Sequence, residues 1–499
     1  MPSHRWLACR VALALALMVG FYALALAVAF GLLWIAYADV TYTNHANARI
    51  LIFCVVGAFS VLWSIIPRPD RFEPPGPRVD ALREPALFAA ISEIAAATGQ
   101  AMPADVYLVN DVNAFVTQRG GIMGFSSHRV MGLGLPLMHA VTVQEFKAIL
   151  AHEFGHYHSG DVALGPWIYK TRAAIGRTIQ RLSSKTLQKI FVAYGTLFLR
   201  VTHAVSRRQE FIADEVAAHA AGADAMKSGL RKVHAATLAF HAYWFSELGP
   251  VFQSGFLPPV NAGFSRFLEN GRILSQLDSA VSHEEAQGQT RPYDTHPSLR
   301  DRITALGVHP AGPGGDSRRA ASLLANIPQR EREVLEFVSR DLASLTRVEW
   351  EHVIDSVYVP LWRQRLAQHG YLLKAITVGA IPASRTDFVR LGSPLFTTDQ
   401  SPSEDERVGR MGQLVVAAIA LRLLSVGWKA ETSPGDEIVL LHDGLELRPS
   451  SELSAILEGR ATRDEWRARC LTMGIADLPL IAGGDPEAAQ TGAPPAAGH

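Results

Sequence analysis

Two short segments of the chain hold residue types that bind a metal ion and activate water. In the first, AHEFGHYHSGD, the residues His152, Glu153 and His156 make the pattern His-Glu-x-x-His. On a helix, His152 and His156 project from one face and can share a zinc ion, and Glu153 beside them can deprotonate a zinc-bound water. The chain contains 18 histidines, so this pattern should occur by chance only about 0.03 times. The spacing therefore predicts a zinc site on a helix.

A catalytic zinc ion needs a third protein ligand. The metzincin continuation is excluded, because Ser159 and Val162 stand where that class has a glycine and a histidine. Downstream, SRRQEFIADEVAA supplies Glu210 and Asp214, which are four residues apart on a strongly helical segment. Such carboxylate pairs are common on solvated helix faces. Together with the histidine motif, however, Glu210 becomes the leading candidate ligand and Asp214 the acceptor for a ligand imidazole.

Cysteine is excluded as the source of a metal site. The three cysteines, Cys9, Cys54 and Cys470, are far apart and odd in number, so they make neither a CxxC clip nor a disulfide framework. Any metal must therefore be held by histidine and carboxylate side chains, one zinc ion per chain in this interpretation.

The elements around the motif are predicted to be a helix and a small sheet. Thr142 and Glu145 fit a capping box that opens the helix carrying the first motif. Upstream, short apolar runs between turn residues predict strands at 106–109, 114–116 and 130–131. The interval 166–250 reads mostly as helix. The fold class expected is α+β, predominantly α.

Length and charge limit the function classes. A chain of 499 residues predicts two or three compact units. Its 47 basic and 47 acidic side chains balance, which argues against a nucleic-acid partner. The mean hydropathy is +0.11 with only 19% charged residues, so part of the chain should be far more apolar than the rest.

That apolar part is the N-terminus, predicted as a membrane anchor over 1–66. Residues 11–38 carry no charge and exceed a bilayer core as a helix, and residues 50–66 are just long enough for a second span. A cleaved signal peptide ending near Ala29 is the alternative for the first run, but signal peptides use a shorter apolar stretch. Arginines gather before the first span and after the second. Both ends should therefore face the cytosol.

The rest of the chain divides at turn-rich segments. A proline-rich linker over 67–80 precedes the predicted metallopeptidase domain at 81–310, and a glycine-rich break at 311–315 precedes an accessory region at 316–482. Residues 190–199 read as a buried core helix, with a third membrane span as the alternative. Helices and a β-hairpin closed by Asp443-Gly444 are expected in the accessory region, and a disordered tail at 483–499.

These motifs together resemble a known family. The N-terminal anchor, the Asn-Ala-Phe run at 113–115, HEFGHYHSGD, SRRQEFIAD and THPSLRDRI are similar to motifs of the HtpX-like and CAAX-prenyl-protease-like membrane zinc endopeptidases, which are gluzincins. The resemblance covers about 81–307, roughly half of the chain, and it implies a minigluzincin-type domain. HtpX-like members usually carry further membrane helices between the two metal motifs. In this chain that interval offers only residues 190–199, which puts a membrane-embedded chamber and a prenylated substrate in doubt.

The resemblance also implies roles for individual residues. His152, His156 and Glu210 would bind zinc, Glu153 would be the general base, and Asp214 would buttress the site. Asn113 would contact the substrate backbone. His296 and Arg302, in the family's His-Pro-x-x-x-x-Arg motif, would steady the developing oxyanion.

The function expected is a membrane-anchored zinc endopeptidase that cleaves polypeptides, membrane proteins included, through a zinc-bound water activated by Glu153. It would sit in a bacterial inner membrane, in contact with the lipid bilayer, with its catalytic domain in the cytoplasm. The alternative is a non-catalytic tethered scaffold or chaperone with a vestigial or structural metal site. An adaptor role of the C-terminal half is compatible with the first interpretation.

Overall fold

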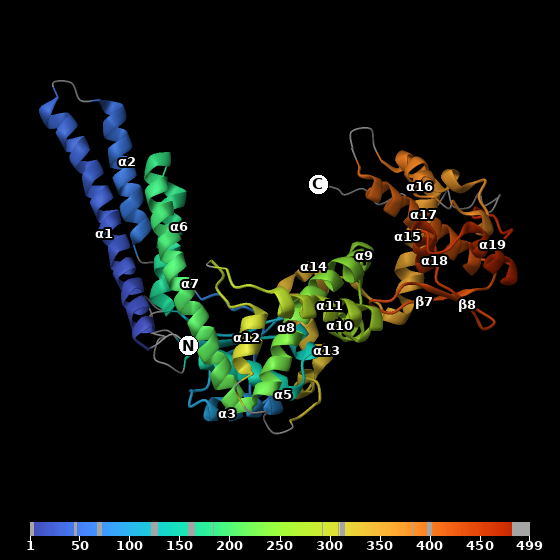
Figure 1. The fold of residues 1–499 in the computed structure, drawn as a ribbon, viewed down its shortest axis with the longest axis horizontal. Helices are drawn as coiled ribbons and strands as arrows, with labels where there is room; N and C mark the ends of the chain where they lie inside the picture. Colours follow the sequence, from blue (N-terminus) through green and yellow to red (C-terminus); the bar gives the residue numbers. More distant parts are fainter. Residues whose placement is uncertain are drawn as a thin grey trace. The chain divides into compact units, whose positions relative to one another are not determined.

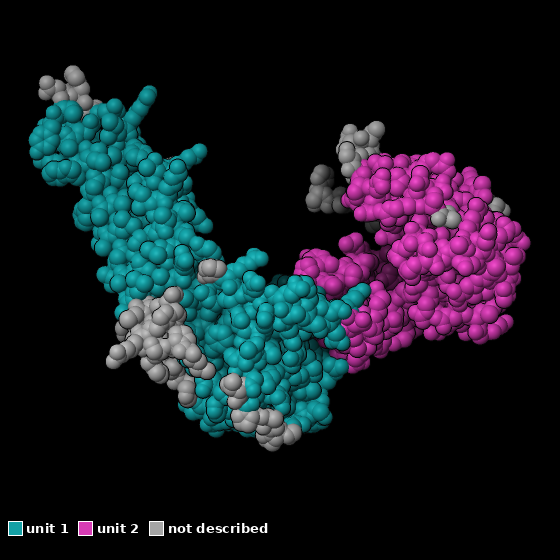
Figure 2. All heavy atoms as spheres, in the orientation of Figure 1, with its two compact units in different colours: residues 1–238, 276–340 teal, residues 239–275, 341–499 magenta. Residues whose placement is uncertain are grey.

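The fold was examined in a computed structural model, which describes residues 4–43, 47–66, 72–120, 128–157, 165–182, 184–291, 293–307, 309, 315–382, 384–396 and 402–481. The chain forms two compact units, coloured separately in Figure 2. Unit 1 contains 1–238 and 276–340, and unit 2 contains 239–275 and 341–499. Both are mostly helical, with small sheets. The predicted tail at 483–499 lies outside the described residues.

Two long apolar helices open the chain: α1 (His4–Tyr42) and α2 (Ala48–Ile65). Each contains a stretch long and apolar enough to cross a membrane, Ala12–Tyr42 in α1 and the whole of α2. The predicted spans coincide with these helices, apart from one residue at the end of α2. The chain therefore begins with a pair of candidate membrane spans that pack against each other.

A second helical pair packs on the first. It consists of α6 (Gly165–Arg181) and α7 (Lys185–Ala221), which Figure 1 shows beside α1 and α2. Phe21 of α1 packs edge-on against Phe191 of α7. The hydroxyls of Ser64 in α2 and Thr178 in α6 are 2.6 Å apart. All four helices thus share one apolar cluster.

The prediction of a short buried core helix at 190–199 is wrong. This segment is the N-terminal part of the 37-residue helix α7. Phe191 and Phe198 are buried against the spans, whereas Ile190, Val192 and Leu197 are 44 to 49% exposed. Only one face of the segment is therefore covered by protein, and its opposite face is apolar and open.

The sheet of unit 1 has four strands in the order β1-β2-β4-β3. β2 and β4 run parallel, and the other two pairs are antiparallel. The three predicted strands are confirmed but are longer than expected: β2 (Asp105–Val109), β3 (Ala114–Arg119) and β4 (His128–Gly134). The short strand β1 (Arg78–Val79) was not predicted. Among the described residues β3 pairs with β4 alone, so no described strand lies on its other edge. The helix α5 (Val143–Gly155) contacts β3 and is flanked by α3 (Pro85–Ala97).

Further helices complete unit 1: α4 (Leu135–Ala140), α8 (Ala223–Tyr243), α11 (Gly271–Gln287), α12 (Leu299–Leu306), the 3-10 helix η3 (Ala320–Leu323) and α13 (Ile327–Val338). The chain passes between the units within α8 and α11 and at the start of α14 (Arg340–Ala343). A buried ion pair holds α13: Arg330 Nε lies 2.7 Å from Glu84 Oε1, and both side chains are at most 5% exposed.

Unit 2 is built around the buried helix α17 (Glu404–Leu424). Its other elements are η2 (Trp244–Leu248, a π-helix), α9 (Gly249–Gln253), β5 (Phe256–Leu257), α10 (Val260–Glu269), β6 (Thr346–Arg347), η4 (Trp350–His352), η5 (Ile354–Tyr358, a π-helix), α15 (Val359–His369), η6 (Gly370–Leu373), η7 (Val378–Ala380), α16 (Arg385–Gly392), η8 (Ser393–Leu395), β7 (Lys429–Glu431), β8 (Val439–His442), β9 (Leu445–Leu447), α18 (Pro449–Leu457) and α19 (Arg463–Thr472). β8 and β9 pair across Asp443 and Gly444, which both have positive φ. That geometry is what a type I′ turn requires.

The units divide at other places than the predicted boundary at 311–315. Residues 239–275 belong with the C-terminal region because they pack on it: β5 pairs with β6, and Trp350 Nε1 donates to the Pro259 carbonyl. Residues 316–340 belong with unit 1, where Arg330 meets Glu84. The glycine-rich sequence at 311–315 is therefore not the edge of a unit.

Candidate metal centre

The helix that carries the His-Glu-x-x-His motif is fixed at its start by the predicted capping box, which is confirmed. Thr142 Oγ1 accepts from the Glu145 amide at 3.3 Å, and Glu145 Oε2 accepts from the Thr142 amide at 2.7 Å. α5 ends at Gly155, with His156 as its C-cap. The rings of His152 and His156 are 4.8 Å apart between centroids. Both imidazoles thus leave the last turn of α5 together.

α7 brings the third candidate ligand to these histidines. Glu210 Oε2 lies 3.5 Å from His152 Nε2, and Glu210 Oε1 lies 3.8 Å from His156 Nε2. The close approach of the two helices depends on a glycine. A Cβ atom on Gly155 would lie 2.8 Å from Cα of Ala213 on α7. The small residue inside the motif therefore allows α7 to present Glu210 to the histidines.

These three residues fit a zinc ion. One ligand atom from each lies within 4.8 Å of the others. Two ligands of a tetrahedral zinc ion are roughly 3.3 to 3.6 Å apart, given bonds of about 2.0 to 2.2 Å. Glu210 Oε2 is buried, and the nitrogens that face it, Arg302 Nη1 and His152 Nε2, are no closer than 3.4 and 3.5 Å. A buried carboxylate oxygen in that state is suited to a cation.

Asp214 and Arg302 lie behind the ligands. Asp214 Oδ1 is 3.0 Å from His152 Nδ1, which leaves Nε2 of that ring facing Glu210. Arg302, on α12, donates to both oxygens of Asp214, through Nη2 at 2.6 Å and Nε at 2.9 Å. Its Nη1 lies 3.4 Å from Glu210 Oε2. This network orients a ligand ring and a ligand carboxylate at once.

Burial and neighbouring charges set the protonation states of the three candidate ligands. Burial, although it opposes ionisation, is outweighed by hydrogen bonds from His152 and His296, which hold the pKa of Glu210 far below its usual range. Burial and the nearby His152 lower the pKa of His156 to about 4, so that its imidazole is neutral. For His152, burial lowers the pKa, but hydrogen bonds to Asp214 and Glu210 raise it to about 9. A metal binding at Nε2 must therefore displace a proton from His152.

Glu153 lies between this cluster and the sheet. Burial raises its pKa to about 7, against the opposing charge of His152. Its carboxylate hydrogen bonds to the main-chain amide of Val116 in β3. A carboxylate that titrates near neutral pH beside a metal cluster is suited to general base chemistry.

His296 and Asn113 occupy the rim. His296 Nδ1 lies 2.8 Å from Glu210 Oε1, and its side chain is 66% exposed. Asn113 precedes β3, has an exposed side chain, and accepts at its main-chain oxygen from the Gly134 amide at 2.8 Å. The structure therefore brings together every candidate site residue except Asn113. Among the described residues, Asn113 has no contact with His152, His156 or Glu210.

Two residues near the cluster were not among the candidates. Gly155 carries a signal that could have been read, since a glycine between two ligands on a helix indicates close packing. Tyr157 carries no such signal in the sequence. Its hydroxyl donates to the Val116 carbonyl at 2.9 Å, and the Arg129 guanidinium lies 4.4 Å above its ring. Both polar main-chain groups of Val116 are thus taken by α5 and the residues that follow it.

Comparison with known proteins supports the same assignment. Residues 81–308 match peptidase family M48. The chain is 28% identical over 242 residues to Protease HtpX of Pseudomonas entomophila, covering 44% of this chain and 70% of the relative. Protease HtpX of Stutzerimonas stutzeri is 24% identical over 293 residues, or 53% of this chain and 89% of the relative. No solved structure matches.

The family match at 81–308 covers the segment that contains both metal motifs. The matches agree with the two apolar helices at the N-terminus and with the cluster of His152, His156 and Glu210. The predicted resemblance to the HtpX-like family of membrane peptidases is thereby confirmed, with residues 81–308 as the segment that matches family M48.

Proposed function

We propose that this protein is a zinc-dependent endopeptidase that hydrolyses peptide bonds of polypeptide substrates at a membrane. The observation that carries the proposal is the meeting of His152, His156 and Glu210 beside Glu153, on the side of the sheet where β3 has a free edge. His152, His156 and Glu210 would hold one zinc ion. When bound, zinc would supply Lewis acidity toward the scissile carbonyl and toward water.

Glu153 is the proton carrier in this proposal. Its carboxylate takes the proton of the attacking water and delivers it to the leaving amine. The raised pKa supports both transfers, because the group can hold and release a proton near neutral pH. The Val116 amide holds the carboxylate at the edge of β3. The base is thus tied to the strand along which a substrate would lie.

The substrate lies extended along that strand. An exposed sheet edge binds polypeptide main chain by adding a strand, which suits an enzyme for unfolded or extended segments. The main-chain amide and carbonyl of Val116 already hydrogen bond to Glu153 and Tyr157. A substrate strand would therefore pair with the outward main-chain groups of β3 on either side of Val116. The exposed amide of Asn113 would hydrogen bond to the substrate backbone.

His296 is the better placed of the two oxyanion candidates. Its side chain is exposed at the rim and hydrogen bonds to Glu210, which raises its pKa and favours a second N–H donor. Arg302 is engaged with Asp214 through two donors. In this proposal Arg302 positions Asp214 and Glu210, and its own oxyanion role stays a prediction.

The location follows from the arginines that flank the spans. With Arg5 and Arg10 before the apolar stretch of α1 and four arginines soon after α2, the peptidase domain would face the cytoplasm of a bacterial cell. Substrates would then be cytoplasmic polypeptides and cytoplasmic segments of membrane proteins.

The test compares zinc content and cleavage in the full-length protein. Wild type, purified in detergent, should contain one zinc per chain by mass spectrometry and cleave casein in a chelator-sensitive way. Glu153→Gln should keep zinc and lose cleavage by about 10²- to 10⁴-fold, whereas Glu210→Ala should lose zinc. Full cleavage by the Glu153→Gln protein would refute the mechanism. Zinc without any cleavage in wild type would favour the scaffold alternative.

A further inference from the structure

From α6 to the middle of α7 the chain carries positive charge only. Between Asp161 and Glu210 the sequence has no acidic residue. Over the same interval it has nine basic ones: Lys170, Arg172, Arg177, Arg181, Lys185, Lys189, Arg200, Arg207 and Arg208. The hairpin of α6 and α7 packs on two candidate membrane spans. A cationic surface at that place has the charge sign that attracts acidic lipid headgroups.

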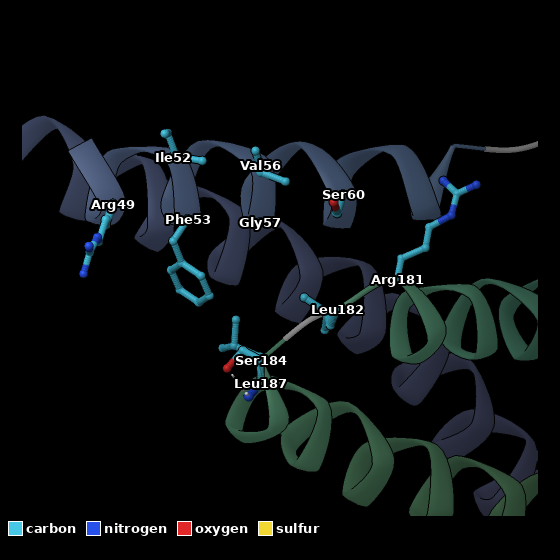
Figure 3. A pocket seen from close by; sticks show the side chains of 10 residues that line it. All are labelled: Arg49, Ile52, Phe53, Val56, Gly57, Ser60, Arg181, Leu182, Ser184 and Leu187. Atoms are coloured by element: carbon cyan, nitrogen blue, oxygen red, sulfur yellow. Dashed lines mark hydrogen bonds between the residues drawn. The ribbon is translucent and has the colours of Figure 1, made fainter. Parts of the chain in front are cut away.

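An apolar groove lies where the turn between α6 and α7 meets α2. Its volume is about 380 Å³. Figure 3 shows the lining residues, with Phe53 of α2 projecting toward Leu187 at the start of α7. The other lining residues are Arg49, Ile52, Val56, Gly57, Ser60, Arg181, Leu182 and Ser184. Close to the groove, α6 is held against α2, because Arg177 on α6 donates two hydrogen bonds to the Ser64 carbonyl of α2.

Arginines stand at the two ends of this groove. Arg49 lies in the first turn of α2, and Arg181 is the last residue of α6 (Figure 3). Both are exposed, and neither forms an ion pair with a carboxylate of the described residues. An unpaired guanidinium at the end of an apolar groove is suited to a phosphate group.

We propose that this groove binds an acidic glycerophospholipid, with an acyl chain along α2 and the phosphate held by Arg181 at one end of the groove. The groove spans from Arg49 to Ser60, which is about 16 Å along a helix. A single acyl chain fits such a volume, whereas a protein helix about 10 to 12 Å in diameter does not. Because α2 is a candidate span, the groove opens toward lipid.

The experiment measures lipid binding to the delipidated full-length protein. Native mass spectrometry would follow titration with dioleoyl phosphatidylglycerol and with dioleoyl phosphatidylcholine, which has the same chains and no net charge. Wild type should retain the acidic lipid in preference. Arg181→Gln should weaken its binding about fivefold, as expected for one basic side chain at a membrane surface.

Two further variants separate a built site from diffuse attraction. Arg200→Gln removes one exposed charge from α7 outside the groove and should leave the affinity unchanged. Ser60→Phe fills the groove and should weaken both lipids, and Phe53→Ala provides a second change to the lining if the first variant does not fold. Equal affinity of wild type for the two lipids would overturn the proposal. So would an equal loss in Arg200→Gln and Arg181→Gln, or unchanged binding in a folded Ser60→Phe protein.

Discussion

Asp214 is the residue on which the alignment of the metal ligands depends. It accepts from His152 Nδ1 and is itself held by Arg302 through two hydrogen bonds. Replacing it with asparagine removes the charge that both partners face. Asp214→Asn should therefore lower zinc affinity about 10- to 100-fold, as measured by competition with a chromophoric chelator.

The matched control for this change is Glu215→Gln, which neutralises the exposed neighbouring carboxylate on the same helix. It should bind zinc as wild type does. If the two variants lost equal affinity, general charge would explain the effect and not the hydrogen bond to His152.

Glu247 makes unit 2 sensitive to pH. Burial raises its pKa to about 6 from an ordinary value of 4.5, against the lowering effect of the Gly435 amide and Arg272. The folded state therefore binds the proton more tightly than the unfolded state. Stability should fall by about 1 to 2 kcal/mol as the pH rises from below 4.5 to above 6.

Comparing thermal unfolding of wild type and Glu247→Gln at pH 5 and pH 7.5 tests this sign. The glutamine variant should gain melting temperature relative to wild type at the higher pH. Parallel pH profiles of the two proteins would contradict the prediction.

At this scale, the sequence was most informative where chemistry depends on local spacing. His152, Glu153 and His156 follow from a four-residue period, and Glu210 from its pairing with Asp214 four residues on. The hydrogen bonds between Arg302 and Asp214 span 88 residues of sequence, so they were not predictable from spacing. For His296 and Arg302, only the resemblance to a family pointed to the site.

The contact between α5 and α7 is the packing feature that assembles the ligands. Adding a methyl group to Gly155 would place it 2.8 Å from the Ala213 Cα atom, and backbone cannot yield as a side chain can. Gly155→Ala should cost about 1 to 3 kcal/mol of stability by overpacking and move Glu210 from the histidines. The melting temperature and the zinc content would both fall.

Gly176→Ala provides the comparison, because a Cβ atom at this position of α6 meets nothing within 4 Å. It should be neutral or stabilising by about 1 kcal/mol through helix propensity. Retained zinc in Gly155→Ala would show that the helices can separate without loss of the site.

Elements with a strong local signal were predictable, and those defined by partners were not. Thr142 and Glu145 predict a capping box at the start of α5, and that capping box is present. For residues 190–199 the predicted helix is correct, but the predicted burial is not. The part of this segment that is buried packs against α1, which is far away in sequence. Apolar content alone cannot tell a face covered by protein from one that is open.

At the scale of the molecule, the division of the chain decides how the C-terminal half can be studied. Removing everything after Gly315 would take Arg330 from Glu84, a carboxylate with no exposed surface. An uncompensated buried charge costs about 3 to 5 kcal/mol. We expect the truncated protein to lose cleavage and zinc through instability of unit 1, whatever the role of unit 2.

Arg330→Met in the full-length chain isolates this effect, since it leaves unit 2 intact. It should lower the melting temperature of unit 1, and adding Glu84→Gln should restore part of the loss. An unaltered melting temperature in Arg330→Met would mean that truncation reports directly on unit 2. The boundary itself was not predictable, because residues 239–275 are joined to unit 2 by contacts distant in sequence.

The single helix α7 connects the candidate membrane spans to the candidate metal ligands. Movement of the helix at the spans is therefore transmitted to the ligands. Tyr194 on α7 donates to the Leu17 carbonyl of α1, and Glu210 lies 16 residues further along the same helix. That distance is about 24 Å on a stiff rod. A functional site tolerates displacements of about 0.5 Å, which the rod reaches at a tilt of only about 1°. We therefore expect that changes in bilayer thickness or tension that tilt α7 would alter the geometry of the candidate ligands.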